Sequence, residues 1–273
     1  MLEAFKNHWP EYAIEGGCLA AFMVSACSFA ALLGHPASPV QSWMLGGLPM
    51  RILMGLAMGF TAVALIYSPW GMRSGAHMNP AVTFTFWRLG KVQSWDAFFY
   101  VLFQFAGGIF GVLLVHAVLR GWVSHPAVNY AVTQPGHQGE VVAFAAEAFI
   151  SFLLMSVILA VSNTQKLARF TGLFAGALVA SYITFEAPVS GMSMNPARTV
   201  GSAFSAHSWT GLWIYFAAPL SGMLLAAEFY VRMRGARSVR CAKLHHQNNQ
   251  RCIFRCGYAV TEGSAGTEMS KIV

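Results

Sequence analysis

The sequence predicts an all-α membrane protein with six transmembrane helices and two re-entrant half-helices arranged as an inverted repeat. Three observations carry this prediction. Hydrophobic residues make up 56% of the 273 residues and charged residues only 10%, whereas a soluble domain carries roughly 25% charged residues. Six apolar runs are long enough to cross about 30 Å of hydrocarbon, which takes about 20 helical residues. Two shorter apolar runs each follow nearly the same decapeptide.

The six long runs are continuous rather than alternating, which favours helices over the strands of a membrane barrel. The predicted spans are residues 11–33, 48–67, 95–119, 141–161, 167–187 and 209–231. They form a membrane domain over residues 11–233, with repeats over about 11–120 and 141–233. Residues 1–10 are expected to form a short N-terminal segment and residues 234–273 a basic, disordered tail.

The net charge of +7 is concentrated after the last span rather than spread over a nucleic-acid surface. Seven basic residues crowd this tail: Arg232, Arg234, Arg237, Arg240, Lys243, Arg251 and Arg255. Basic residues gather on the cytoplasmic side of membrane proteins. We therefore expect a multi-pass protein of the cell membrane with both termini in the cytoplasm, in contact with lipid and not with nucleic acid.

Residues 74–83 (SGAHMNPAVT) and 190–199 (SGMSMNPART) match at seven of ten positions, with a constant offset of 116. The apolar runs that follow, 80–89 and 196–204, are too short to span. Each half also contains three full spans, and because this number is odd the second half enters the membrane upside down. The two half-helices should therefore enter from opposite faces and meet at the midplane, where inverted repeats place their binding sites.

The tripeptide Asn-Pro-Ala begins each half-helix, as Asn79-Pro80-Ala81 and as Asn195-Pro196-Ala197. Asn is a favoured N-cap and Pro a favoured first helical residue. The Asn oxygen can accept from its own helix, which leaves the amide NH2 as an outward donor. Each helix start also carries about half a positive charge. The pair should donate hydrogen bonds, repel cations and prevent a bound water from relaying a proton.

The residues before each Asn must be non-helical, and such backbone is tolerated at membrane depth where it lines a wet cavity. We expect these carbonyls to face the pore: those of Gly75, Ala76, His77, Gly191, Met192 and Ser193. A structural hydrogen-bonding role is expected for the His77 side chain in preference to pH gating.

With its paired Ser-Gly-x-x-x-Asn-Pro-Ala motifs, the chain resembles the aquaporin (major intrinsic protein) family over residues 11–233. Arg198 continues the second motif, and Gln104 matches a glutamine of the third span in that family. Glu15 and Glu147 match buried glutamates that hold the two re-entrant loops in the family. The resemblance implies a homotetramer with one pore per subunit and a narrow outer filter that includes Arg198.

Counting back from each Asn, as the family does, gives the other filter positions. They are Gly59 (or Phe60, if the alignment slips by one residue), Ile183 and Met192. Water-selective members usually carry an aromatic residue at the first position and His at the second, so this filter is atypical. Thr199 and the pair Tyr215-Phe216 nevertheless resemble the water-type branch of the family.

The function implied is a passive channel for water that also passes small neutral solutes such as glycerol, urea or ammonia and excludes protons and ions. An ion-coupled secondary transporter and a closed structural member of the family are the alternatives. With no nucleophile–base pair or phosphate loop in the sequence, we predict no enzymatic activity, catalytic residue or cofactor.

The tail contains Cys252 and Cys256, with His245 and His246 upstream, but we judge this spacing poor for zinc and predict no metal site. A mobile basic tail near anionic lipid is expected instead.

Overall fold

The computed structural model describes residues 1–41 and 47–258. The long helices are α1 (Leu2–Gly34), α2 (Gly47–Tyr67), α5 (Ser94–Leu119), α7 (Glu140–Ser162), α8 (Thr171–Phe185) and α11 (Ile214–Arg234). The short helices are α3 (Pro69–Ser74), α4 (Pro80–Arg88), α6 (Gly121–Ser124), α9 (Ala187–Ser190) and α10 (Pro196–Ala206), with 3-10 turns η2 (Asn129–Ala131), η3 (Ala168–Phe170) and η4 (Ala236–Ser238).

Among the described residues, six helices are long and apolar enough to cross a membrane, which confirms the predicted number of spans. Helices α2, α5 and α7 agree with the predicted ranges to within one residue, whereas α8 begins at Thr171 and α11 at Ile214, each several residues later than predicted. Helix α1 begins at Leu2, so the segment 1–10 is helical and continuous with the first span. Helix α11 continues to Arg234.

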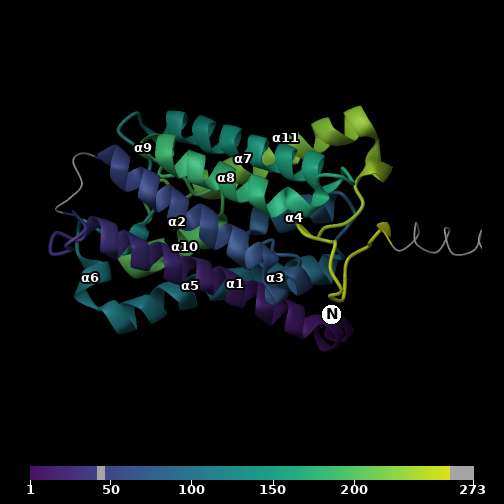
Figure 1. Ribbon diagram of the computed structural model, residues 1–273, viewed down its shortest axis with the longest axis horizontal. Helices are drawn as coiled ribbons and strands as arrows, with labels where there is room; N and C mark the ends of the chain where they lie inside the picture. Colours follow the sequence, from purple (N-terminus) through teal and green to yellow (C-terminus); the bar gives the residue numbers. More distant parts are fainter. Residues whose placement is uncertain (42–46, 259–273) are drawn as a thin grey trace, which may run out of the picture.

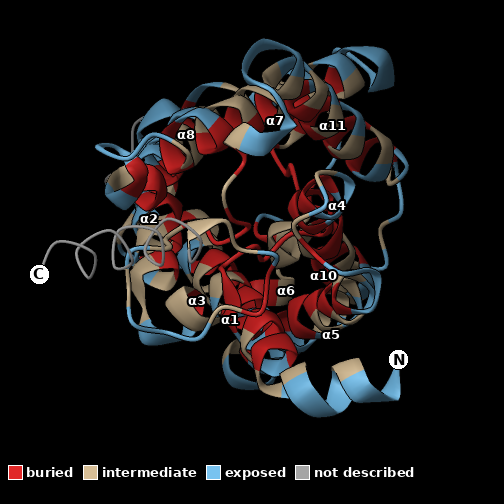
Figure 2. Cartoon of the chain, turned by 90° about the vertical axis from the view of Figure 1, so that its right-hand side faces the viewer, coloured by how far each residue is buried: buried red, intermediate tan, exposed pale blue. Residues whose placement is uncertain are grey.

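The long helices run side by side along the longest axis of the molecule (Figure 1) and surround its centre when viewed end-on (Figure 2). Helix α1 packs on α5, as α7 packs on α11. The half-helix α4 packs on α11 and α10 packs on α5, so each half-helix lies against the last span of the other repeat. This exchange is the arrangement that an inverted repeat predicts.

Glycines allow the closest of these helix contacts, because they lack a side chain where two backbones meet. A Cβ at Gly59 would lie 2.7 Å from the carbonyl oxygen of Gly176, where α2 crosses α8. A Cβ at Gly108 would lie 2.6 Å from the carbonyl oxygen of Ala197. Gly108 thus lets the first turn of α10 lie directly on α5.

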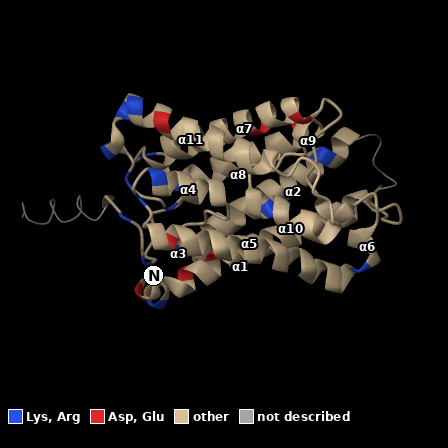
Figure 3. Cartoon of the chain, turned by 180° about the vertical axis from the view of Figure 1, so that it is seen from behind, with Lys and Arg blue, Asp and Glu red and all other residues tan. Residues whose placement is uncertain are grey.

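The N-terminus and residues 236–258 lie at the same end of the bundle, as an even number of spans requires (Figure 1). Lys and Arg are also gathered at this end (Figure 3). We call it the inner end and the opposite one the outer end.

Residues 239–258, which we call the folded tail, differ from the prediction of a disordered tail. They fold back against the inner end, and several side chains are buried there: Val239, Cys241, Ala242, Lys243, Leu244, Ile253 and Phe254. The apolar residues among them explain the difference, because the basic residues between them made the segment look solvated in sequence. Residues 259–273, the rest of the predicted tail, lie outside the described residues.

Candidate functional site

The two half-helices begin with the capping geometry that Asn-Pro-Ala predicts. Oδ1 of Asn79 accepts a hydrogen bond from Ala81 N at 2.9 Å, and Oδ1 of Asn195 accepts from Ala197 N at 3.1 Å. A proline occupies the first turn of each helix, where its missing N–H costs nothing. The N-terminal ends of α4 and α10, with their partial positive charges, therefore meet at the centre of the bundle.

Each Asn amide also donates to the opposite loop. Nδ2 of Asn79 lies 2.7 Å from the Met194 carbonyl oxygen, and Nδ2 of Asn195 lies 2.6 Å from the Met78 carbonyl oxygen. From the sequence the whole NH2 group was expected to face a permeant, but in each Asn one of the two N–H bonds joins the loops. The second N–H of each amide remains to face the cavity that both Asn side chains line.

The loop before each half-helix repeats the same unusual backbone. Positive φ angles occur at Ala76 (57°) and Met192 (51°), and again at Met78 (49°) and Met194 (54°). Each pair is separated by the same offset of 116 as the decapeptides. A non-glycine residue in this region costs about 1–3 kcal/mol, so the surrounding structure must hold the loops in place.

Glu15 holds the first loop. Its carboxylate accepts from Ser74 Oγ at 2.8 Å, from the backbone N–H of Met78 and from Gln104 Nε2 at 2.9 Å. The Glu15 side chain is fully buried. Three donors satisfy the hydrogen-bonding capacity of this buried carboxylate. It can therefore fix the loop without leaving a buried acceptor unpaired.

Glu147 holds the second loop in the same way. Its carboxylate accepts from Ser190 Oγ at 2.9 Å, from Ser193 N at 2.6 Å and from Met194 N at 2.7 Å. Ser74 and Ser190 begin the two decapeptides, but no role was predicted for them from the sequence.

Two tyrosines also fix the loops, and this role was not predicted from the sequence. Tyr100 OH donates to the Ser74 carbonyl at 2.6 Å, and Tyr215 OH donates to the Ser190 carbonyl at 2.5 Å. The two tyrosines occupy similar positions in α5 and α11, the third span of each repeat. This similarity is the sequence signal from which their shared role could have been predicted.

A cavity of about 340 Å³ passes between the helices and the two loops. It is lined by Arg51 and Met54 toward the outer end of α2 and by Leu244 of the folded tail at the inner end. The predicted pore residues that line it are Asn79, Asn195, Arg198, Ile183, Met192, Ala76, His77, Gly191 and Ser193. Gly75 is not among the lining residues, and its carbonyl accepts a hydrogen bond from Leu244 N at 3.1 Å.

Neither sequence-based candidate for the first filter position lines the cavity. Gly59 is buried where α2 crosses α8, and Phe60 points away with 70% of its surface exposed. Met54 and Met58 of α2 line the cavity instead. Gly55, which follows Met54, lies against Ala180 and Thr184 of α8, and this contact places Met54 level with Ile183. A count along the sequence missed this, because it fixes neither the rotation nor the depth of α2.

Arg198 lies in the first turn of α10 and lines the cavity. Its Nη1 atom contacts the hydroxyl of Thr133, which is 3% exposed. Thr133 belongs to the segment between α5 and α7, which carries no recognisable motif, so the sequence offered no signal for it. This contact holds the guanidinium at one side of the cavity.

His77 connects the first loop to the folded tail. Its Nδ1 atom lies 3.0 Å from Thr83 Oγ1, and its Nε2 atom lies 2.9 Å from the Ala242 carbonyl oxygen. The ring stacks between Phe86, at 5.3 Å and 18°, and Phe254 of the tail, at 5.4 Å and 15°. These contacts agree with the hydrogen-bonding role expected for this side chain, and they add a partner that the sequence did not predict.

Comparisons with known proteins agree with this geometry. Residues 13–230 match the family described as Major intrinsic protein. Aquaporin NIP2-1 of Zea mays is 38% identical over 182 residues, which cover 66% of this chain and 59% of the relative. Aquaporin NIP2-3 of Zea mays is 36% identical over 190 residues, which cover 69% of this chain and 60% of the relative. The match thus spans less than two thirds of the length of these relatives.

The fold is similar to that in the X-ray structure of the aquaglyceroporin from Plasmodium falciparum. The TM-score is 0.65 at 20% sequence identity, and the match covers 82% of this chain and 95% of that chain. At this identity the likeness concerns the fold alone.

Proposed function

The chain belongs to the major intrinsic protein family, and from this premise we propose that it conducts water and small neutral solutes passively while excluding protons and ions. It is a multi-pass membrane protein of a channel family and not an enzyme. The relatives reported above are NIP-type aquaporins, so the similarity does not point specifically to the water-type branch.

The cavity is the observation that carries the proposal. It is lined from Arg51 at the outer end to Leu244 at the inner end and passes both Asn79 and Asn195. A binding site for one ligand would not need to reach both ends of the bundle. A channel does, and irregular backbone at this depth is tolerated because it lines such a cavity.

Exclusion of cations follows from the meeting of two helix N-termini. Each contributes about half a positive charge at the centre of the cavity, and Arg198 adds a full charge toward the outer end. A water between Asn79 and Asn195 would accept the second N–H of each amide. Its lone pairs would then be engaged, so that it could not accept a proton from a neighbouring water.

Passage of neutral solutes larger than water is supported by the side chains level with Ile183. Met54, Ile183 and Met192 are apolar side chains that line the cavity, whereas Arg198 and Arg51 are charged, and the Arg51 Nε donates to the Thr184 carbonyl at 3.0 Å. Methionine is flexible and adapts its shape to its neighbours. This combination offers both hydrogen-bond donors and apolar contact, which suits the polar and carbon faces of a small polyol such as glycerol.

We further propose that the protein resides in the cell membrane with both termini in the cytoplasm and assembles as a homotetramer. The gathering of Lys and Arg at the inner end supports the orientation (Figure 3). Large apolar side chains on the outside of the bundle are available to lipid or to neighbouring subunits, including Phe110, Phe149 and Leu225, each more than 60% exposed.

Entry of radiolabelled glycerol into proteoliposomes distinguishes a channel from an ion-coupled transporter, the main alternative. For a channel, the initial rate rises linearly with glycerol concentration and does not respond to an imposed proton or sodium gradient. A rate that saturates, or that an ion gradient drives uphill, would contradict the proposal. Empty liposomes provide the background.

A further inference from the structure

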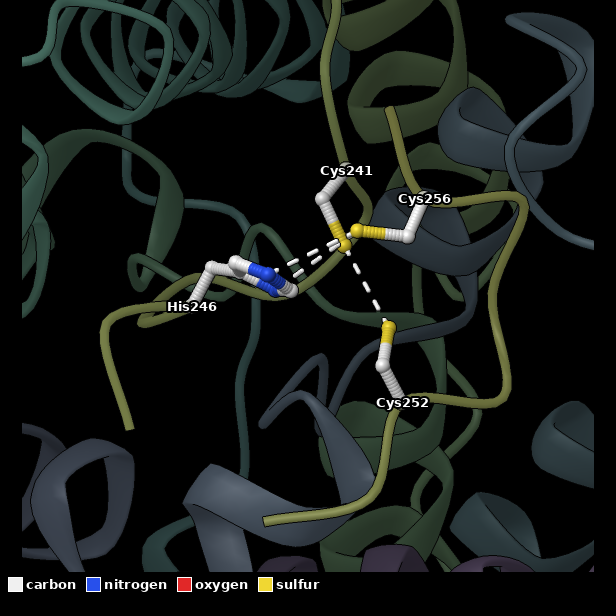
Figure 4. Close-up of side chains that lie close together, drawn as sticks. All are labelled: Cys241, His246, Cys252 and Cys256. Atoms are coloured by element: carbon white, nitrogen blue, oxygen red, sulfur yellow. Dashed lines mark hydrogen bonds between the residues drawn. The ribbon is translucent and has the colours of Figure 1, made fainter. Parts of the chain in front are cut away.

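Three cysteines and one histidine of the folded tail converge on one point at the inner end (Figure 4). They are Cys241, His246, Cys252 and Cys256, and their four ligand atoms all lie within 4.8 Å of one another. The Sγ atoms of Cys241 and Cys252 are 3.6 Å apart, and Cys256 Sγ lies 3.5 Å from His246 Nε2. All five cysteines of the chain are free thiols.

We propose that Cys241, His246, Cys252 and Cys256 form a tetrahedral Zn²⁺ site that fixes the folded tail across the inner mouth of the pore. The binding claim stands on the tail geometry, and the claim about the mouth rests on the proposed function.

The spacing of the four ligand atoms fits zinc. A Zn–S bond of about 2.3 Å places neighbouring ligands of a tetrahedron about 3.8 Å apart, and three cysteines with one histidine form a common structural zinc site. The closest ligand pairs here are 3.5 and 3.6 Å apart, so small shifts would bring all four atoms to one ion. Because no ligand position is left over for water, such a site is structural rather than catalytic.

A Zn²⁺ ion bound by three thiolates and a neutral histidine carries a net charge of −1. The surroundings of the cluster favour such a charge. The backbone N–H of Lys243 points to Cys241 Sγ at 3.5 Å. The Lys243 side chain is only 2% exposed, and its ammonium donates to the Gln250 carbonyl at 3.0 Å. This buried positive charge would balance the site.

The ring of His246 is held in position by stacking on Tyr258, with centroids 4.4 Å apart and planes at 14°. Ordered surroundings of this kind are usual for histidine ligands, whose orientation is fixed by neighbouring groups. The adjacent His245 is not part of the cluster and packs instead against Tyr67. The two histidines therefore provide a matched pair for experiments.

The site would fix a segment that contacts the pore directly. Leu244 lines the cavity, and its N–H donates to the Gly75 carbonyl of the first loop. The Ala242 carbonyl contacts His77, and Phe254 stacks on the same ring. Two of these three residues lie between Cys241 and His246, and Phe254 lies between Cys252 and Cys256. Metal binding would thus order the parts of the tail that cover the inner mouth.

Further contacts tie the same segment to the rest of the inner end. Arg255 N donates to the Lys91 carbonyl at 2.9 Å, and Arg251 Nη1 donates to the Asn7 carbonyl at 3.1 Å. Arg240 N donates to Asn163 Oδ1 at 2.7 Å. The tail therefore reaches the N-terminal helix, the segment after α4 and the end of α7, so its order affects the whole inner mouth.

Cobalt substitution of the full-length protein in detergent tests the site without any flux measurement. The chain is purified, stripped of metal under reducing conditions and titrated with Co²⁺. We expect one Co²⁺ per chain, an intense thiolate-to-cobalt charge-transfer band, visible bands of a tetrahedral ion, and loss of all of them when Zn²⁺ is added. Absence of these bands, or their insensitivity to Zn²⁺, would overturn the site.

Matched variants identify the ligands. The double substitution of Cys252→Ser and Cys256→Ser should abolish the charge-transfer band, and His246→Ala should weaken Co²⁺ binding at least tenfold. Cys18→Ser, at a buried cysteine of α1, and His245→Ala should leave the titration unchanged. A spectrum that survives in the double variant would overturn the assignment. So would metal-free protein isolated under non-reducing conditions with a Cys241–Cys252 disulfide.

Limited trypsin digestion tests the consequence for the tail. The bonds after Arg240, Lys243, Arg251 and Arg255 should be protected in the zinc-loaded protein and cleaved after chelation. Equal cleavage in both states would overturn the claim that the metal orders the tail. These measurements do not depend on transport, so the two proposals can fail separately. A protein that binds metal but conducts nothing would contradict the channel proposal alone. A channel that binds no metal would contradict the zinc site alone.

Discussion

Asn79 and Asn195 exchange hydrogen bonds across the centre of the bundle, each amide donating to the loop that precedes the other. The Nδ2–O distances are 2.7 Å to Met194 and 2.6 Å to Met78. Each Asn therefore caps its own half-helix with its oxygen and joins the two repeats with its nitrogen. The same two side chains set both the position of the half-helices and the polarity of the pore centre.

Asn195→Asp separates these two tasks, because Asp also caps helices but cannot donate to the Met78 carbonyl. We expect the helix to start at the same place and the free energy of unfolding to fall by about 1–3 kcal/mol, the cost of an unsatisfied buried group. The added negative charge should also raise leakage of cations. Fluorescence of a pH dye trapped in proteoliposomes measures the leak, and unchanged proton exclusion would refute the account of the pore centre.

Glu147→Gln should lower stability more than it changes selectivity. The NH2 group of a glutamine would face one of the backbone N–H groups that now donate to Glu147. At least one buried hydrogen bond is then lost, which lowers the free energy of unfolding by about 1–3 kcal/mol. Thermal unfolding in detergent measures this loss. Glu140→Gln, at a carboxylate bonded to Trp213 near the surface, is the control. A fully stable Glu147→Gln protein with altered selectivity would contradict the role of this carboxylate.

Met54→Phe should narrow the pore at the level of Ile183. Glycerol permeability is expected to fall severalfold while water permeability changes less, because an added ring obstructs the larger permeant first. Leu53→Phe is a matched control, since Leu53 is 44% exposed and does not line the cavity. The assignment of Met54 fails if the two variants have the same ratio of glycerol to water permeability as the wild type.

Gly59→Ala tests whether Gly59 packs helices or lines the filter. Its Cβ would lie 2.7 Å from the Gly176 carbonyl oxygen, and such overpacking typically costs about 1–3 kcal/mol. A lower unfolding temperature with unchanged glycerol selectivity is expected. In the control Gly17→Ala, nothing lies within 4 Å of the added Cβ, so stability should not fall. A stable Gly59→Ala protein with altered selectivity would contradict the packing role and would indicate that Gly59 belongs to the filter.

Zinc should reduce water flow through the full-length channel, because it fixes Leu244 and Phe254 at the inner mouth. Chelation should raise the osmotic shrinkage rate of proteoliposomes severalfold in the wild type, and readdition of Zn²⁺ should reverse the rise. The double substitution of Cys252→Ser and Cys256→Ser should be insensitive to both treatments. If chelator and zinc change flow equally in that variant and the wild type, the folded tail does not act on the pore.

Much of the fold could be predicted from the sequence because lipid restricts the choices. Continuous apolar runs must be helices, and the offset of 116 between the decapeptides makes the repeat visible. The capping role of Asn79 and Asn195 also follows from local chemistry. Each of these features is determined by residues close together in the chain or by a repeated sequence motif, so it can be predicted from a single sequence.

What could not be predicted depends on contacts between distant segments. Phe60 was a candidate for the filter because a count along the chain does not fix which face of α2 meets the pore. Thr133 contacts Arg198 from a segment with no recognisable motif. Cys241 is separated from Cys252 by a stretch that contains no other cysteine, and the cluster forms only when the tail folds back. From the sequence, only Cys252 and Cys256 were considered together with the two histidines, and Cys241 was not included.

Stopped-flow light scattering of proteoliposomes tests the central claim, a passive pore past Asn79, Asn195 and Arg198, most directly. The full-length protein is reconstituted with chelator present, and shrinkage is followed under a sucrose gradient and then under a glycerol gradient. We predict shrinkage much faster than in empty liposomes, with a low temperature dependence, followed in glycerol by rapid reswelling. Water and glycerol rates equal to those of empty liposomes, in protein shown to be folded, would contradict the claim.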